Sequence, residues 1–287
     1  MEKSAKIVKL KLDVIFKRVF GNEKNEKIIA RFVSDLLELP RDSIKKIYIS
    51  NVELAPESVD QKFSRLDLKM EFNGKIVNIE IQINYDDNFC DRTLFYWSKM
   101  FSYELKSGET YDDLKKTICI NIINFNLFEW EKYHSRFMAL ETEYHEPMTD
   151  KMDIHFFELK KIGKYRDNKP MQDWLDLINA ETEDELMDVQ KTTTIPEIQD
   201  TIVILRHLSA DEKIRQEAYY REKRLHDEAN ALSNAERKGI MIGREEGRAE
   251  GRAEGRAEGK AEAIESLKEM WRKQGFSEDK IKVLLGE

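Results

Sequence analysis

The clearest pattern of apolar and polar positions in this chain runs from Ser64 to Asn84 and predicts a β-hairpin. Two stretches of alternating apolar and polar residues flank Asn73-Gly74, and both residues of this pair accept the positive φ angles of a type I′ turn. If they form the loop, Leu68 faces Ile79 and the register of the whole hairpin follows. One face is then wholly apolar, and its other pairs are Met70–Val77 and Leu66–Ile81.

The second face of the hairpin is polar, and the register places Asp67 directly opposite Glu80. Carboxylates at such positions have Cβ atoms about 5 Å apart and repel each other. A divalent cation between them would turn this repulsion into a binding site, because hard cations prefer carboxylate oxygens. A solvated face of mixed charges is the alternative, and the pattern leaves both open. The same face carries Lys69 and pairs Arg65 with Gln82.

Helical patterns precede the hairpin. Residues 13–20 and 24–38 have apolar side chains at helical spacing, with Gly21-Asn22 as a stop between them and Pro40 at the end. Residues 44–54 alternate and are rich in β-branched side chains, so they are predicted to form a strand with Ile47, Ile49 and Val52 toward the core.

A helix and two strands are predicted after the hairpin. The helix runs from about Phe89 to Leu105, follows the capping sequence Asp86-Asp87-Asn88, and places Arg92 and Tyr96 on one face. The strands cover residues 117–125, an almost continuously apolar run, and residues 154–159. This order of elements indicates a mixed sheet with helices on its faces.

The remainder of the chain is predicted to be helical. Residues 168–186, 195–208 and 210–232 have helical patterns, and Pro170 and Pro196 fit first-turn positions. From Gly243 the four-residue repeat Gly-Arg-Ala-Glu begins, with glycines at 243, 247, 251, 255 and 259. An isolated helix of this sequence is marginal, because each Gly costs about 1 kcal/mol relative to Ala and like charges fall four apart. Close packing against a second copy of the chain and a solvated tether are both open. Two short amphipathic helices, residues 261–271 and 277–285, are predicted to follow.

Composition narrows the class of protein. The chain has 287 residues, 40% hydrophobic and 36% charged, with a net charge of −8, which argues against a general nucleic-acid coat. Two cysteines indicate a reducing compartment, and five scattered histidines form no zinc pattern. No apolar run approaches the ~18 residues of a membrane span, so we expect a cytoplasmic protein without membrane contact.

Four motifs in order carry a resemblance to a known family. They are DVIFKRVFG at 13–21, RLDL at 65–68, IEIQ at 79–82 and FCDRTLFYW at 89–97. Together they resemble the PD-(D/E)xK nuclease superfamily, and within it the Rpn-type recombination-promoting nucleases, also called PD-(D/E)xK nuclease family transposases. The resemblance covers residues 10–160 and the repeats. It implies a restriction-endonuclease-like α/β fold, a mixed sheet flanked by helices, followed by the all-helical C-terminal region with its Gly-Arg-Ala-Glu repeat.

The resemblance also implies site roles. Asp67 and Glu80 would hold Mg²⁺, with Mn²⁺ or Ca²⁺ as alternatives, and the main-chain carbonyl of Ile81 would be a third ligand. Asp13 would complete the shell or orient a water, although an Asp at a helix start also caps the helix. Gln82 stands where the superfamily usually has lysine, and an amide supplies no positive charge. Lys17, Lys69 and Arg92 are therefore the candidates for the cation that contacts the phosphate.

The resulting expectation is a metal-dependent DNA endonuclease, linked to recombination, mobile elements or phage defence. The alternative is a non-catalytic DNA- or protein-binding module on a nuclease fold that forms a homo-oligomer through its repeat tail. Three regions are expected: a nuclease-like domain at 1–164, a helical region at 165–235, and the repeat tail with terminal helices at 236–287.

Overall fold

A computed structural model describes residues 7–50, 53–54, 64–65, 67–105, 108–163 and 169–286. The chain divides into two compact units, Met1–His226 and Asp227–Glu287. Within the described ranges, no helix is both long enough and apolar enough to cross a membrane.

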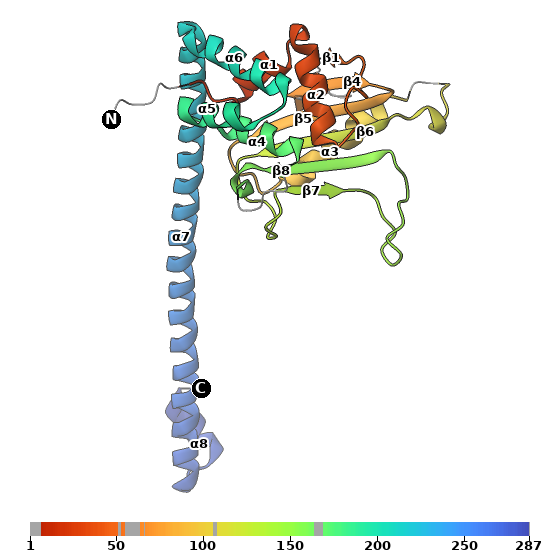
Figure 1. Ribbon diagram of the computed structural model, residues 1–287. Helices are drawn as coiled ribbons and strands as arrows, with labels where there is room; N and C mark the ends of the chain where they lie inside the picture. The colour runs from red at the N-terminus through yellow and green to blue at the C-terminus, as the bar shows by residue number, and fades with distance from the viewer. Residues whose placement is uncertain are drawn as a thin grey trace. The chain divides into compact units, whose positions relative to one another are not determined.

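A six-stranded mixed sheet is the centre of the first unit (Figure 1). Its strand order is β1-β4-β5-β6-β8-β7. Strands β5, β6 and β8 are parallel neighbours. The pairs β1–β4, β4–β5 and β7–β8 are antiparallel. The bounds are β1 Tyr48–Ser50, β4 Leu68–Phe72, β5 Lys75–Gln82, β6 Lys116–Ile123, β7 His134–Phe137 and β8 Met152–Glu158.

The predicted hairpin is formed by β4 and β5. Asn73 and Gly74 have φ angles of 46° and 69°, as a type I′ turn requires. Leu68 pairs with Ile79, so the predicted register is confirmed over the five residue pairs of this ladder. The apolar face of the hairpin is fully buried at Leu68, Met70, Val77 and Ile79.

The register does not extend beyond Leu68. Arg65 belongs to β3 (Ser64–Arg65), which pairs with β2 (Glu53–Leu54) in a separate two-stranded sheet. Its main chain lies opposite Glu53, so the predicted pairing of Arg65 with Gln82 is wrong. Leu66 lies outside the described residues.

Helices cover the apolar face of the hairpin (Figure 1). They are α1 Asp13–Phe20, α2 Glu26–Leu36, α4 Pro170–Asn179, α5 Glu183–Thr192 and α6 Pro196–Ala210. Phe20 of α1 stacks on Phe32 of α2 with ring centroids 4.4 Å apart, and Trp174 of α4 meets Phe32 edge-on at 5.2 Å. These aromatic contacts hold α1, which carries Asp13 and Lys17, against α2 and α4, in the same apolar cluster as Leu68 and Ile79 of the hairpin.

The opposite face of the sheet is covered by α3, Phe89–Tyr103. Phe89 and Met100 are buried there together with Ile76 of β5 and Ile123 of β6. The polar face of the hairpin is therefore covered at β5, where Glu80 has a relative exposure of 8%. The alternative of a solvated face is wrong for this strand.

Several predicted elements differ in extent. The described part of residues 44–54 contains the short strands β1 and β2, and Val52 lies outside the described residues. The predicted helix 168–186 is divided into α4 and α5, because Thr182 begins a new helix with a capping box to Glu185. Strand β7 has no counterpart in the sequence prediction.

The first of the C-terminal helices is longer than predicted, and the second agrees with the prediction for residues 277–285. Helix α7 spans Glu212–Lys273, so residues 210–232, the repeats and residues 261–271 belong largely to one helix, and α8 follows at Glu278–Leu285. A Cβ atom added at any repeat glycine would meet no atom within 4 Å other than those of the adjacent turns of its own helix. The helices α4–α6 belong to the first compact unit, and the three-part division at residues 164 and 235 stays a prediction.

Candidate metal centre on the central hairpin

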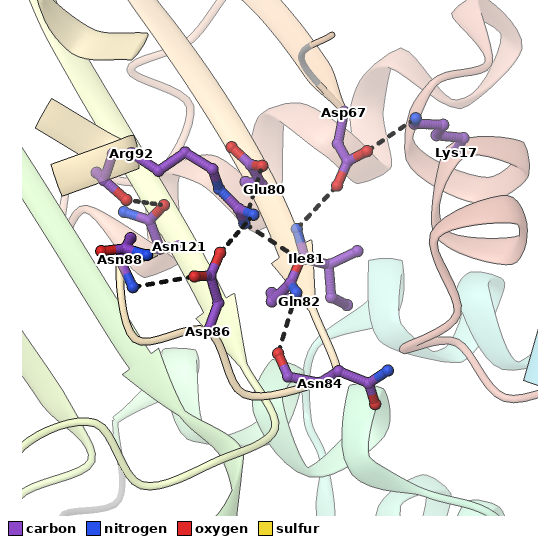
Figure 2. Close-up of polar contacts among 11 residues, drawn as sticks. Lys17, Asp67, Glu80, Ile81, Gln82, Asn84, Asp86, Asn88, Arg92 and Asn121 are labelled. Carbon is purple, nitrogen blue, oxygen red and sulfur yellow. Dashed lines mark hydrogen bonds and ion pairs between the residues drawn. The ribbon is translucent and has the colours of Figure 1, made fainter. Parts of the chain in front are cut away.

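Asp67 and Glu80 come together at one end of the hairpin (Figure 2). Asp67 precedes β4 by one residue and lies outside the ladder, whose last pair is Leu68–Ile79. Its Oδ2 accepts a hydrogen bond from the main-chain N–H of Ile81, at 3.1 Å. The Asp67 carboxylate is thereby fixed beside the strand that carries Glu80.

The surroundings of Glu80 oppose its negative charge. Burial, and after it the nearby Asp67 carboxylate, raise the pKa of Glu80 from 4.5 to about 7, although Arg92, Asn78 and Lys17 counteract this. Two carboxylates in a partly dry position are costly to ionise together. A cation bound between them would remove that cost.

Two basic side chains reach this pair from helices on opposite faces of the sheet. The ammonium of Lys17, on α1, lies 2.8 Å from Oδ1 of Asp67. The guanidinium of Arg92, on α3, lies 2.8 Å from Asp86 and 3.6 Å from Oε1 of Glu80. The centre therefore combines the two acids with two bases, and Asp86 is a third acid that pairs with Arg92 (Figure 2).

Gln82 connects the centre to the chain that follows β5. Its Oε1 accepts a hydrogen bond from Arg92 at 3.2 Å, and its Nε2 donates to the main-chain oxygen of Asn84 at 3.0 Å. The side chain of Asn84 in turn donates to the main-chain oxygen of Leu225, on α7. Both ends of the Gln82 amide are thus engaged, and its carbonyl faces a positive charge.

Two of the predicted residues are engaged elsewhere. The carboxylate of Asp13 accepts a hydrogen bond from Nε of Arg221, on α7, at 2.6 Å. Lys69 lies 3.2 Å from Glu104, which follows the last turn of α3. Arg92 is in the first turn of α3, so Lys69 pairs at the opposite end of this helix from Arg92. Their roles in metal and phosphate binding stay predictions.

Polar residues that the sequence analysis did not assign lie beneath α3. Asn121, 1% exposed, is the register partner of Glu80 on β6, and it accepts a hydrogen bond from Thr93 at 3.3 Å. Asn78, 2% exposed, stabilises the charged form of Glu80 by a side-chain hydrogen bond. Strand alternation from Glu80 would have indicated Asn78, whereas Asn121 depends on a parallel register that no local pattern fixes.

Tyr96 also belongs to this environment. It lies one helical turn after Arg92 and is half-buried. Burial, and secondly the charge of Glu80, raise the pKa of Tyr96. Its hydroxyl therefore stays protonated at neutral pH, which leaves it able to donate a hydrogen bond toward an anion.

The oxygen donors of this centre fit a hard divalent cation. Asp67 and Glu80 supply carboxylate oxygens, and burial with mutual repulsion makes this a position where positive charge is favoured. Over the described ranges no group of three or more His, Cys, Asp or Glu side chains could hold a metal ion. A cation here would therefore draw on two carboxylates, main-chain carbonyl oxygen and water.

A mixed sheet flanked by helices, with an acidic pair on its central hairpin, defines the restriction-endonuclease-like α/β class. The sequence model of the PD-(D/E)XK nuclease family transposases matches residues 10–235, and the chain belongs to this family. Comparisons with curated proteins and with solved structures give no match. Membership of the family makes the chain a nuclease-type hydrolase linked to mobile elements, with DNA as the substrate that the family indicates.

Proposed function

We propose that this protein is a Mg²⁺-dependent endodeoxyribonuclease that hydrolyses phosphodiester bonds in the cytoplasm, in recombination, mobile-element movement or phage defence. The observation that carries the proposal is the buried Glu80 beside Asp67, where burial, and after it the charge of Asp67, raise the pKa of Glu80 to about 7. Such a pair has no evident structural benefit, because like charges in a partly buried position destabilise the fold. Cation binding would supply the compensating interaction.

The carboxylates of Asp67 and Glu80 would hold the cation, with the main-chain carbonyl of Ile81 as the third protein ligand. The bound cation would supply Lewis-acid charge at the phosphate and make an attacking water more acidic. The hydrogen bond from the N–H of Ile81 holds the Asp67 carboxylate in position and uses only Oδ2 of its two oxygens. Asp13 would have to leave Arg221 before it could orient a water.

Arg92 would supply the positive charge that Gln82 lacks. The Arg92 guanidinium donates to the Gln82 amide and lies 3.6 Å from Glu80, so its charge is held next to the position of a family lysine. It also lies over the ring of Phe89, 4.7 Å from the centroid, which limits its movement. A preorganised guanidinium stabilises charge that develops on phosphate oxygens.

Plasmid cleavage tests the proposal. Purified protein is incubated with supercoiled plasmid and Mg²⁺, Mn²⁺, Ca²⁺ or EDTA, and the nicked and linear products are measured. We expect cleavage with Mg²⁺ or Mn²⁺ that Glu80→Gln abolishes. Glu71→Gln is the matched control, because Glu71 also lies on the hairpin but pairs with Lys115. Absence of metal-dependent cleavage, or full cleavage by Glu80→Gln, would overturn the proposal.

A non-catalytic binding module on the same fold is the second candidate. It is favoured by the ion pairs that already occupy Asp67 and Asp13, and by the net charge of −8. The same assay separates the two functions, since a binding module would retain DNA in a gel-shift experiment and leave the plasmid supercoiled.

Self-association through the repeats is proposed as a separate property of α7. The repeat glycines are solvent-exposed and have open space around them, so a second helix could approach the backbone closely. The Arg and Glu side chains on either side would pair if the two helices ran antiparallel.

A further inference from the structure

The ion pair between Lys17 and Asp67 occupies the position that the proposed cation would need. The Lys17 ammonium is 2.8 Å from Oδ1, and the main-chain N–H of Ile81 is 3.1 Å from Oδ2. Both oxygens of Asp67 therefore have a positive or partially positive partner. The side chains of Lys17 and Asp67 are only 31% and 18% exposed, so water screens their interaction incompletely.

Hydrogen-bond capacity alone would let Asp67 keep Lys17 and bind a cation, because a carboxylate has about four acceptor positions. Charge does not allow it. A divalent cation and an ammonium group on the same carboxylate oxygen would lie a few ångströms apart, and their repulsion is strong where water is partly excluded. Binding of the cation thus requires Lys17 to move.

We propose that Lys17 is a built-in counter-ion of Asp67, that a divalent cation displaces it, and that the displaced ammonium binds a phosphate oxygen of DNA. This inference rests on the proposed function and assigns a positioning role to one residue of that site. The metal and the DNA would then bind cooperatively, because the first frees the group that the second uses.

The neighbours of Lys17 support this direction of movement. Asp13 lies one helical turn earlier on α1, a spacing from which a carboxylate could recapture the ammonium. Asp13 is already held by Arg221, at 2.6 Å. Lysine has a flexible stem and a compact charge, so it can change partners at little cost, whereas Arg92 is restrained by Gln82, Asp86 and Phe89.

Metal affinity without DNA gives the first test. Mn²⁺ binding is measured by titration calorimetry for the wild-type protein, Lys17→Met, Lys17→Arg and Arg18→Met. Arg18 is the matched control, because it follows Lys17 on α1, pairs with Glu217 and carries the same charge. We expect Lys17→Met to bind Mn²⁺ about fivefold more tightly than wild type, with Arg18→Met and Lys17→Arg close to wild type.

The salt dependence of DNA binding gives the second test. A fluorescent duplex is titrated at several salt concentrations with Ca²⁺ or with EDTA. Lys17→Met should reduce the slope of log K against log salt by about one in Ca²⁺ and leave it unchanged in EDTA, because only the metal-loaded protein would use Lys17 on a phosphate.

Equal Mn²⁺ affinity of Lys17→Met and Arg18→Met would overturn the exchange, and so would an equal change of slope in Ca²⁺ and EDTA. Thermal unfolding checks that Lys17→Met is folded. If it is not, Lys17→Gln, which also removes the charge, takes its place and should show the same gain in Mn²⁺ affinity. Failure of the wild type to bind Mn²⁺ would overturn the metal assignment and the exchange together. Confirmed exchange without plasmid cleavage would overturn only the proposed nuclease activity.

Discussion

Arg221, on the long helix α7, lies 2.6 Å from the carboxylate of Asp13, which is 208 residues earlier in the chain. Asp13 begins α1, and Lys17, one turn later, pairs with Asp67. Two ion pairs joined by one turn of α1 therefore connect α7 to the candidate metal centre. A second connection runs from Leu225 of α7 through Asn84 to Gln82. The part of α7 within the first unit therefore supports the centre from outside the hairpin.

Arg221→Gln should lower the free energy of unfolding by about 1–2 kcal/mol, because it leaves the partly buried Asp13 without its counter-charge. Urea unfolding of the wild type, Arg221→Gln, Asp13→Asn and the double variant measures the coupling. Lys223→Gln, which removes the same charge from an exposed position on α7, should change stability by less than about 0.5 kcal/mol. Additive effects of the two single substitutions would contradict the pairing.

Local sequence chemistry predicted the part of the fold that depends on neighbouring residues. The Asn73-Gly74 pair predicted the turn, and the register then predicted that Val77 and Ile79 of β5 lie on the apolar face of the hairpin. The start of α5 could also have been predicted, because Thr182 is followed three residues later by Glu185, which is the pattern of a capping box. The helical spacing of apolar residues on either side instead suggested one continuous helix.

The remainder depended on contacts between distant segments. Strand β7, His134–Phe137, is short and mostly polar, and it forms by pairing with the edge of β8. No local pattern in the sequence predicts this pairing. The predicted register suggested that Asp67 and Glu80 lie close together, although the ladder itself ends at Leu68–Ile79. The partners Arg221 and Asn121 come from segments whose placement depends on the complete fold. Long-range ion pairs leave no periodic trace in a sequence.

Moving one positive charge tests whether Arg92 replaces the usual lysine. Gln82→Lys alone should destabilise the centre, because its ammonium would lie next to the Arg92 guanidinium that now donates to the amide at 3.2 Å. Arg92→Gln alone should reduce cleavage by about 10²-fold, the typical loss for a group that stabilises transition-state charge. The double variant Gln82→Lys, Arg92→Gln should recover a large part of that loss. Plasmid cleavage rates and melting temperatures decide, and a double variant no better than Arg92→Gln would contradict the assignment.

Glu80→Gln should stabilise the metal-free protein above pH 7 while abolishing cleavage. The pKa of Glu80 is raised to about 7 in the folded state from 4.5, so between these values the folded state binds more protons than the unfolded state. Stability contributed by the protonated acid is thus lost as the pH rises through 7. Gln cannot ionise, and its advantage should reach up to about 3 kcal/mol at pH 8, fall to about 1 kcal/mol at pH 5 and vanish below the unfolded pKa of 4.5.

Urea unfolding in EDTA at pH 5 and pH 8 measures this difference. Glu71→Gln, on the same hairpin, serves as the control and should show no comparable change between the two pH values. A Glu80→Gln protein less stable than wild type at pH 8 would contradict the electrostatic description of the centre.

His134 should make the protein lose stability in acid. Burial, and secondly the neighbouring His155, lower the pKa of His134 from 6.5 to about 4. The unfolded state then binds more protons between these values, so stability is present above pH 6.5 and is lost as the pH falls toward 4. His134→Gln should reduce this loss by about 2 kcal/mol at pH 4. The free energy of unfolding of both variants is measured at pH 4.5 and 7.5, with His207→Gln, at an exposed position on α6, as the control. Identical pH profiles for the two variants would contradict a role of His134 in the loss of stability.

Deletion of residues 243–261 should reduce the mass of the particle in solution, because this segment carries the glycines proposed to pack against a second helix. Light scattering measures the mass, and the first compact unit ends at His226, well before the deletion, so its fold should persist. A variant with Ala at all five repeat glycines keeps the length and gains about 1 kcal/mol of helix propensity at each position. If close backbone approach drives association, this more helical variant should also dissociate, whereas pairing through Arg and Glu alone would leave it associated. Self-association through the repeats would be excluded if the wild-type protein is already monomeric. It would also be excluded if the deletion variant keeps the same number of chains per particle as the wild type.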